Sequence, residues 1–208
     1  MSPRCPTCDK PTGICVCDRI QPLSVRTRVL VLQHPLEPDE VLGTAPLLAM
    51  SLPGQVLVRT GTMWASLADA LGEEADNDAW AGLWRGQLPR ELDPAEQAAA
   101  FLSLDRRGRP RPRPWTGLVV LDGTWAQAKA LWWRNPWLLR LGRVLLQPRE
   151  ASIYGKVRRE PRREAVSTLE AVADALVGNG EDPAVRAALR SLMRTMVQRA
   201  RDTAPGRA

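Results

Sequence analysis

The stretch GLVVLDGTW, residues 117–125, decides the fold class. Its first five residues, Gly117–Leu121, are continuously apolar, which is typical of a strand buried on both faces of a parallel sheet. Asp122 follows at once, and open α/β sheets bind their ligands at the carboxyl ends of the strands. From Thr124 onward the pattern becomes helical. The stretch therefore predicts a buried strand that carries a carboxylate to the ligand-binding edge of a sheet.

The rest of the chain alternates strand-like and helix-like segments in the same way. We expect strands at Arg26–His34, Gln55–Arg59 and Arg143–Leu146, and helices from Thr44 to Pro53, over Ser66–Ala75, from Pro94 through Leu104, from Ser167, and over Pro183–Arg201. The helix at Pro94 is expected because Asp93 suits a cap and proline suits a first helical turn. Together these segments predict an α/β fold with a mainly parallel sheet and flanking helices.

Composition and charge narrow the class of protein. The chain has 208 residues, enough for one domain and a small appendage. Its apolar runs are shorter than the ~18 residues of a membrane span, and its first residues do not resemble a signal peptide. We therefore expect a soluble cytoplasmic protein with no membrane association and no obligate protein partner. The net charge of +6, carried almost entirely by arginine, indicates a polyanionic partner or a genomic bias toward arginine.

Arginines gather in three places along the chain. Those of two loops are Arg106, Arg107, Arg109, Arg111 and Arg113, and then Arg158, Arg159, Arg162 and Arg163. Prolines alternate with arginines in the first, so that we expect residues 106–114 to form an exposed basic loop. Arg186, Arg190 and Arg194 share one face of the last helix. That face is either the solvated side of a docked helix or a surface that follows phosphates.

All the cysteines lie within the first 17 residues, as Cys5, Cys8, Cys15 and Cys17. The C-x2-C spacing and the turn-forming residues around it predict a structural zinc site of four thiolates, with no open coordination position. Two disulfides or simple thiols are the alternatives, and disulfides are disfavoured in a cytoplasmic chain. We assign residues 1–20 to a zinc-binding module and residues 21–208 to a single catalytic domain.

Asp122 is the best candidate for a working carboxylate, since it directly follows an apolar strand. The alternative is that Asp122 and Gly123 form only a strand-to-helix turn, with Thr124 as the helix cap. Trp125 lies directly in the turn and is placed to meet a ligand. The sequence shows no Ser-His-Asp or HExxH arrangement, and the single histidine, His34, ends a strand close to Glu37.

Asp122-Gly123-Thr124-Trp125 resembles the Asp-x-Thr-Trp signature of the DTW-domain family. Further sequence blocks of that family occur in this chain, in the same order as in the family. They are the cysteine cluster, LQHPLEP (32–38) with GTAPLL (43–48), and SIYGKVRREPRREAVSTLEA (152–171). Four blocks in order, over residues 4 to about 175, are far more specific than one Asp-x-Thr-Trp. The basic loop at 106–114 is not part of the signature.

This resemblance implies a tRNA-uridine aminocarboxypropyltransferase that uses S-adenosylmethionine and acts on the tRNA variable loop. It implies a fold related to the knotted SPOUT methyltransferases. Asp122 would be the base that takes the proton from uridine N3, with Thr124 and Trp125 beside it. Trp125 would stack on the uridine or lie against the sulfonium. An RNA methyltransferase of similar fold, a ribosomal-RNA aminocarboxypropyltransferase and a non-catalytic zinc-containing RNA-binding protein are the alternatives.

The remaining site residues follow from the same resemblance. We expect the cofactor to be bound by Leu121, Ser152, Tyr154, Ser167, Thr168 and Glu170. We expect RNA to be bound by His34, Arg158, Arg159, Arg162 and Arg163, of which Arg158 and Arg159 could meet the cofactor carboxylate instead. Ser167 and Thr168 offer donors at a helix N-terminus, a favourable seat for a carboxylate. Glu170 is either a cofactor ligand or the capping partner of that helix.

Overall fold

The computed structural model describes residues 3–84, 99–111, 114–147, 150–155, 157 and 166–203. Six strands within these residues form one sheet, in the order β2-β1-β5-β3-β6-β4. They are β1 (Arg28–Gln33), β2 (Val56–Thr60), β3 (Trp80–Trp84), β4 (Phe101–Leu104), β5 (Gly117–Asp122) and β6 (Gly142–Leu146). Neighbouring strands are parallel except for β4 with β6. The expected α/β class with a mainly parallel sheet is confirmed.

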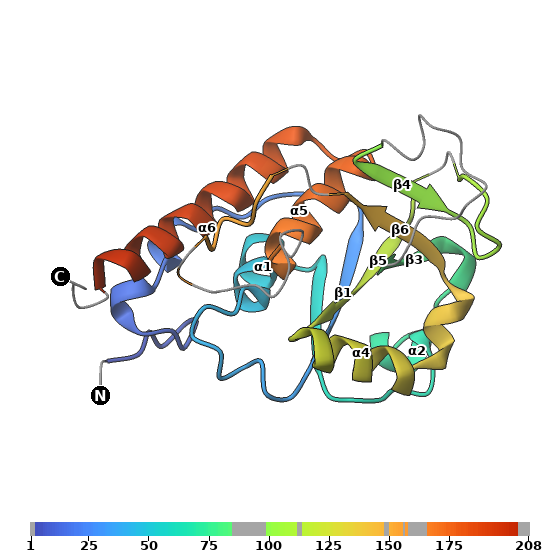
Figure 1. The fold of residues 1–208 in the computed structure, drawn as a ribbon, viewed down its shortest axis with the longest axis horizontal. Helices are drawn as coiled ribbons and strands as arrows, with labels where there is room; N and C mark the ends of the chain where they lie inside the picture. Colours follow the sequence, from blue (N-terminus) through green and yellow to red (C-terminus); the bar gives the residue numbers. More distant parts are fainter. Residues whose placement is uncertain are drawn as a thin grey trace.

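Helices cover both faces of the sheet (Figure 1). The α-helices are α1 (Ala45–Ser51), α2 (Leu67–Leu71), α4 (Trp125–Arg134), α5 (Thr168–Gly178) and α6 (Pro183–Thr203). Short 3-10 turns are η1 (Thr12–Ile14), η2 (Cys17–Arg19), η3 (Asn77–Ala79) and η4 (Pro136–Arg140). Helices α1, α5 and α6 lie on one face, and α2 and α4 lie on the other. Among the described helices, none combines the length and the apolar character needed to cross a bilayer.

The central strands alternate their side chains between two buried clusters. Val29 and Val31 of β1 pack with α1, α5 and α6. Leu30 and Leu32 of the same strand pack with α2 and η4 on the opposite face. Because both faces are covered, the strand is apolar at its four inner positions, Val29 to Leu32. These two clusters fix the plane of the sheet and hence the position of its carboxyl edge.

Phe101–Leu104 forms strand β4, so that our prediction of a helix through these residues is wrong. Leu102 and Leu104 point to one side and pack with Leu145 of β6 in a small cluster. The alternation of FLSL suits an edge strand, and pairing with β6 outweighs the helical signal of the alanines that precede it. The first half of the expected helix falls in residues 85–98, outside the described residues.

Strand β3 was not predicted. Its sequence, WAGLW at 80–84, holds no β-branched residue and has a glycine at its centre, so two tryptophans are its only strand signal. The strand lies between β5 and β6, where Gly117 of β5 leaves room for the Trp80 ring. A Cβ at Gly117 would lie 2.5 Å from that ring. Tertiary packing therefore decides this element.

Candidate functional site at the carboxyl edge of the sheet

A row of polar side chains crosses the carboxyl ends of the central strands. Asp122 ends β5 and lies beside Gln33, its register partner at the end of β1. Gln33 Nε2 donates a hydrogen bond of 2.9 Å to Asp122 Oδ2, and Gln33 Oε1 accepts one of 3.2 Å from Thr60 Oγ1 of β2. Thr168 Oγ1, at the start of α5, donates to Asp122 Oδ1. Both carboxylate oxygens of the buried Asp122 are therefore oriented by donors.

The segment that follows β1, residues 34–44, covers this edge. The backbone N–H of His34 donates to the Asp122 carbonyl at 2.9 Å, and His34 Nδ1 accepts a bond of 3.3 Å from Leu36 N. Glu37 is buried in the same segment, with 4% of its surface exposed. Because β1 lies between β2 and β5, His34 and Glu37, which follow it, lie at the same sheet edge as Asp122.

Two side chains from distant parts of the chain hold the carbonyls of residues 41–43. Lys10 Nζ donates to Val41 O at 3.0 Å and to Gly43 O at 2.6 Å, while Tyr154 Oη donates to Leu42 O at 2.7 Å. Both side chains are buried. Burial lowers the pKa of Lys10, and the charge of Asp122 acts in the opposite direction. We call residues 41–43 with these two anchors the carbonyl clamp.

The N-terminus of α5 is built around a fully buried carboxylate. Glu170 accepts bonds from the Ser167 backbone N–H at 3.0 Å and from Ser167 Oγ at 2.9 Å. It also accepts from Ser152 Oγ at 2.8 Å and Ile153 N at 3.0 Å. Ser167 Oγ in turn accepts from Glu170 N, which completes a capping box. Glu170 therefore plays the capping role that we set as its alternative, and it ties the segment at 152–153 to α5.

Helix α4 begins immediately after Asp122 and turns aromatic and basic side chains outward. A capping box between Thr124 and Gln127 starts the helix, which is the structural role weighed for Thr124. Trp125 is 38% exposed and Trp133 is 72% exposed. With the exposed Lys129 between them, they stand at positions i, i+4 and i+8 and so share one face. We call these three residues the α4 stripe.

The cysteines converge as a metal site requires. The Sγ atoms of Cys5, Cys8, Cys15 and Cys17 all lie within 4.8 Å of one another. Cys5 Sγ is 3.9 Å from Cys17 Sγ, and Cys8 Sγ is 3.7 Å from Cys15 Sγ. Thiolates at ~2.3 Å from a tetrahedral zinc ion stand about 3.8 Å apart, whereas disulfide sulfurs stand about 2 Å apart. The donor set and its spacing therefore fit a four-thiolate zinc ion.

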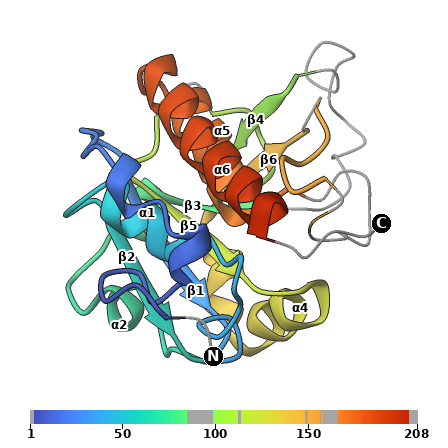
Figure 2. The same ribbon diagram turned by 90° about the vertical axis from the view of Figure 1, so that its left-hand side faces the viewer.

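The cysteine module is docked on α6 (Figure 2). Arg199 of α6 makes a two-pronged ion pair with Asp18, with both bonds at 2.8 Å, and also donates to the Cys15 carbonyl. Val16 is fully buried in the cluster formed by α1, α5 and α6. Lys10 reaches from the other side of the module into the carbonyl clamp. The module is therefore continuous with the core and reaches the edge that carries Asp122.

The DTW domain family model matches residues 2–201. The chain belongs to the DTW-domain family. Among curated relatives of this DTW domain, tRNA-uridine aminocarboxypropyltransferase 2 of Mus musculus is 33% identical over 178 residues, which are 84% of this chain and 55% of the relative. The protein of the same name from Drosophila melanogaster is 30% identical over 200 residues, 93% of this chain and 73% of the relative.

The same name is carried by a Macaca fascicularis protein that is 31% identical over 177 residues, again 84% of this chain and 55% of the relative. The DTW domain described here therefore spans about half the length of the mouse and macaque relatives, and about three quarters of the fly protein. No solved structure matches the chain. Residues 2–201, which the family model matches, contain both the cysteine module and the Asp-x-Thr-Trp turn.

The predicted site residues divide into three groups in this DTW domain. Leu121, Asp122, Thr168 and His34 meet at the carboxyl edge, and Trp125 follows in the turn. Ser152, Tyr154, Ser167 and Glu170 form the supporting network behind that edge. The predicted RNA-binding arginines Arg158, Arg159, Arg162 and Arg163 lie outside the described residues.

Two residues of the site were missed in the sequence. Gln33 follows the apolar run VLVL (29–32), and a polar residue at the end of such a run was the available signal. The structure places it beside Asp122. Lys10 is one of three lysines in the chain and follows the C-x2-C pair by two residues. Nothing in its spacing indicates that it is buried against residues 41–43, since that contact depends on how the module docks.

Proposed function

We propose that this chain transfers the 3-amino-3-carboxypropyl group of S-adenosylmethionine to N3 of a uridine in tRNA, with a uridine of the variable loop favoured. The observation that carries the proposal is the oriented, buried carboxylate of Asp122 within the family signature. The names of the curated relatives support the same activity. A family member with this carboxylate at the ligand-binding edge of the sheet has the group that the reaction needs.

Asp122 acts as the general base in this proposal. Gln33 and Thr168 hold one carboxylate oxygen each, so the side chain is fixed before the substrate arrives. For N3 to give up its proton, the uracil ring must leave the base stack and lie within hydrogen-bond reach of the Asp122 carboxylate. RNA loops permit this movement. Proton transfer to Asp122 gives N3 the electron pair with which it forms the new bond.

The residues at the edge fit S-adenosylmethionine by their chemistry. The indole ring of Trp125 suits its sulfonium cation, and the N-terminus of α5, where Thr168 is half-buried, suits its carboxylate. Ser167 caps that helix and Ser152 donates to Glu170, so Thr168 and Leu121, beside Asp122, are the stronger candidates for contact with the cofactor. When bound, this cofactor supplies an electrophilic carbon on a positively charged sulfur. Transfer of the aminocarboxypropyl group breaks that carbon–sulfur bond and leaves 5′-methylthioadenosine.

The α4 stripe supports an RNA substrate. Helix α4 carries Lys129 and Arg134 and no acidic residue, so its exposed face is positively charged. Trp125 and Trp133 are exposed on this basic face, and nucleobases stack on such rings with little sequence preference. Since the stripe begins three residues after Asp122, nucleotides beside the reacting uridine would reach it first. This arrangement favours an unpaired RNA segment as the substrate.

The remaining features of the proposal follow from the family resemblance and from the cysteine geometry. We propose one structural zinc ion on Cys5, Cys8, Cys15 and Cys17, a SPOUT-like topology with a knot, and a cytoplasmic location. Metal analysis of the purified protein tests the zinc ion, with one equivalent per chain expected.

The test of the activity is mass spectrometry of nucleosides from unmodified tRNA incubated with the protein and S-adenosylmethionine. We expect a uridine heavier by one aminocarboxypropyl group together with 5′-methylthioadenosine. A methylated uridine with S-adenosylhomocysteine would establish the RNA methyltransferase instead. If tRNA binds but is not modified, the protein is the non-catalytic, zinc-containing RNA-binding protein. If ribosomal RNA is modified and tRNA is not, the protein is the ribosomal-RNA aminocarboxypropyltransferase.

A further inference from the structure

The basic segment between β4 and β5 is folded back on the sheet. Asp105 closes its turn by accepting bonds from the backbone N–H groups of Arg107 and Arg109, at 2.8 and 3.0 Å. Gly108 takes the left-handed conformation that the turn needs, with φ of 81°. The backbone of Arg111 then returns to bond Ser103 O of β4 at 2.8 Å. The sequence predicted an exposed basic loop, and Arg106, Arg107 and Arg109 are exposed, in a turn that the bonds to Asp105 close.

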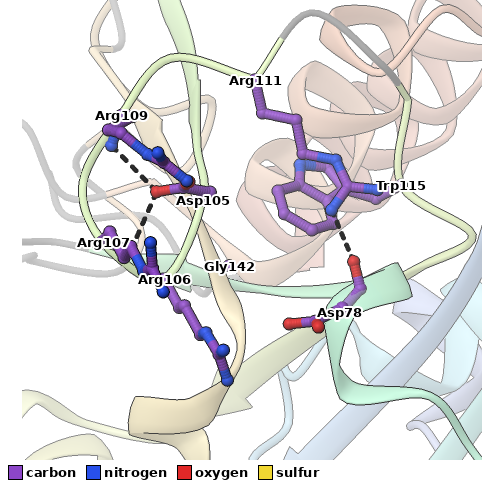
Figure 3. A pocket seen from close by; sticks show the side chains of 8 residues that line it. All are labelled: Asp78, Asp105, Arg106, Arg107, Arg109, Arg111, Trp115 and Gly142. Carbon is purple, nitrogen blue, oxygen red and sulfur yellow. Dashed lines mark hydrogen bonds and ion pairs between the residues drawn. The ribbon is translucent and has the colours of Figure 1, made fainter.

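This turn forms one wall of a pocket of about 310 Å³ that opens between four arginine side chains (Figure 3). They are Arg106, Arg107, Arg109 and Arg111. The opposite wall comes from Asp78, just before β3, and the floor from Trp115 and Gly142, at the start of β5 and β6. The pocket therefore lies at the amino ends of the parallel strands, on the opposite edge of the sheet from Asp122.

The floor of the pocket is rigid. Trp115 is buried, its backbone N–H donates to Asn179 Oδ1 at 2.7 Å, and its indole N–H donates to Ser103 Oγ at 2.8 Å. The indole lies against Gly142, where a Cβ would stand 1.9 Å from the ring. The Arg111 guanidinium stacks on this indole at 3.8 Å from the ring centroid and donates to the Asp78 carbonyl. Arg111 is therefore held in place before any ligand arrives.

The charge of the pocket is positive. Its lining holds four guanidinium groups and two carboxylates, and Asp105 is engaged by Arg109 at 2.7 Å. Among the described residues, no ion pair joins a carboxylate to Arg106, Arg107 or Arg111. Three forked donors around one pocket, one of them preset by stacking, match the geometry of a phosphate group.

We infer that this arginine pocket binds a phosphodiester of the tRNA at a distance from the reacting nucleotide, an inference that rests on the proposed function for its RNA substrate. Strand β5 runs from the pocket to Asp122 over six residues, which corresponds to about 17 Å at ~3.3 Å per residue. The phosphate in the pocket therefore belongs to a nucleotide other than the target uridine. The pocket adds affinity and positions the RNA, while chemistry stays at the other edge.

The experiment compares two double variants that each remove two exposed arginines. Arg106→Ala with Arg107→Ala removes two side chains from the pocket wall. Arg19→Ala with Arg201→Ala, the α6 variant, removes equal charge at the C-terminal end of α6. Binding of unmodified, fluorescently labelled tRNA is measured over a salt series. We expect the pocket variant to bind roughly tenfold more weakly and its log Kd–log salt slope to fall by about 0.7 per lost phosphate contact. We expect the α6 variant to behave like the unaltered protein.

Arg111→Lys provides a second variant, because it keeps the charge and loses the fork and the stacking. It should also weaken tRNA binding, with kcat for transfer unchanged at saturating tRNA. Equal losses in both double variants, or no loss in the pocket variant, would overturn the inference. If inorganic phosphate bound the unaltered protein but not the pocket variant, and tRNA bound both equally, the pocket would be a small-anion site and the RNA assignment would be wrong.

These outcomes are separable from those of the proposed function. If the protein transfers the group normally and the pocket variants bind tRNA like the unaltered protein, only the inference about the pocket is wrong. If tRNA binding depends on the pocket but no nucleoside is modified, the inference about the pocket stands and the proposed reaction is wrong.

Discussion

Gln33 and Thr168 orient the Asp122 side chain, so a substitution can keep this orientation and remove only the ability to accept a proton. Replacing it with asparagine keeps the size of the side chain and the bond to Thr168, and removes the basic oxygen. We expect Asp122→Asn to abolish group transfer and to leave S-adenosylmethionine binding within about a factor of three. Single-turnover assays and calorimetric titration measure the two quantities. Thr168→Val is the companion variant, which should slow transfer without abolishing it, and full activity in Asp122→Asn would remove the base from the mechanism.

The indole of Trp133 gives a second prediction at the same scale. Because 72% of its surface is exposed, Trp133→Ala removes little packing and should leave thermal stability unchanged. If a base stacks on it, tRNA binding should weaken by about 1–3 kcal/mol. Trp133→Phe should restore most of the loss, and Met63→Ala, at another exposed apolar side chain, serves as the control. Equal affinity for the alanine variant would show that the exposed ring serves something other than this RNA.

At the scale of elements, the turn between α5 and α6 is fastened to the start of β1 by one carboxylate. Glu181 Oε1 accepts bonds from Arg26 N at 3.0 Å, Thr27 N at 2.8 Å and Thr27 Oγ1 at 2.7 Å. Burial alone would raise the pKa of Glu181, but these bonds outweigh burial and lower it. The charged form is therefore the one that stabilises the fold.

A lowered folded-state pKa contributes stability above the unfolded value of 4.5, and that stability is lost as the pH falls through the folded value. We expect Glu181→Gln to cost about 1–3 kcal/mol at pH 7 and progressively less below pH ~4.5, where the native residue also becomes neutral. Urea unfolding at a series of pH values measures this. Glu73→Gln, at a half-exposed carboxylate, is the control, and a cost independent of pH would contradict the assignment.

The sequence allowed prediction of the elements whose local signals agree with their packing. The apolar run before Asp122, the helix cap at Ser167 and the cysteine cluster each carry their own pattern, and each is found where expected. Strand β3 was missed because its place depends on how the Trp80 ring fits against β5. The contact between Lys10 and residues 41–43 was missed for a similar reason, since it joins segments about 30 residues apart through the docking of a module.

At the scale of the whole molecule, the cysteine module links the four-thiolate cluster to the edge that carries Asp122. Removing the proposed zinc ion would release the turns that carry Lys10, and with them one anchor of the carbonyl clamp. We expect a strong chelator to lower the unfolding temperature, by about 2–4 °C per kcal/mol for a domain of this size, and to reduce transfer. Differential scanning calorimetry with a parallel activity assay tests this. Cys17→Ser should reproduce both losses, and chelation should then add nothing further.

The docking of the module on α6 also sets the order in which the molecule can be completed. Asp18 and Arg199 are separated by 181 positions in sequence, and the clamp joins Lys10 and Tyr154 through residues 41–43. On the ribosome, the module emerges before α6, and its docking must wait until that helix has been made. Its buried face stays open throughout that interval. Until α6 has left the exit tunnel, Val16 and Asp18 lack the surface on which they pack, and the edge that carries Asp122 lacks the support that the docked module gives it.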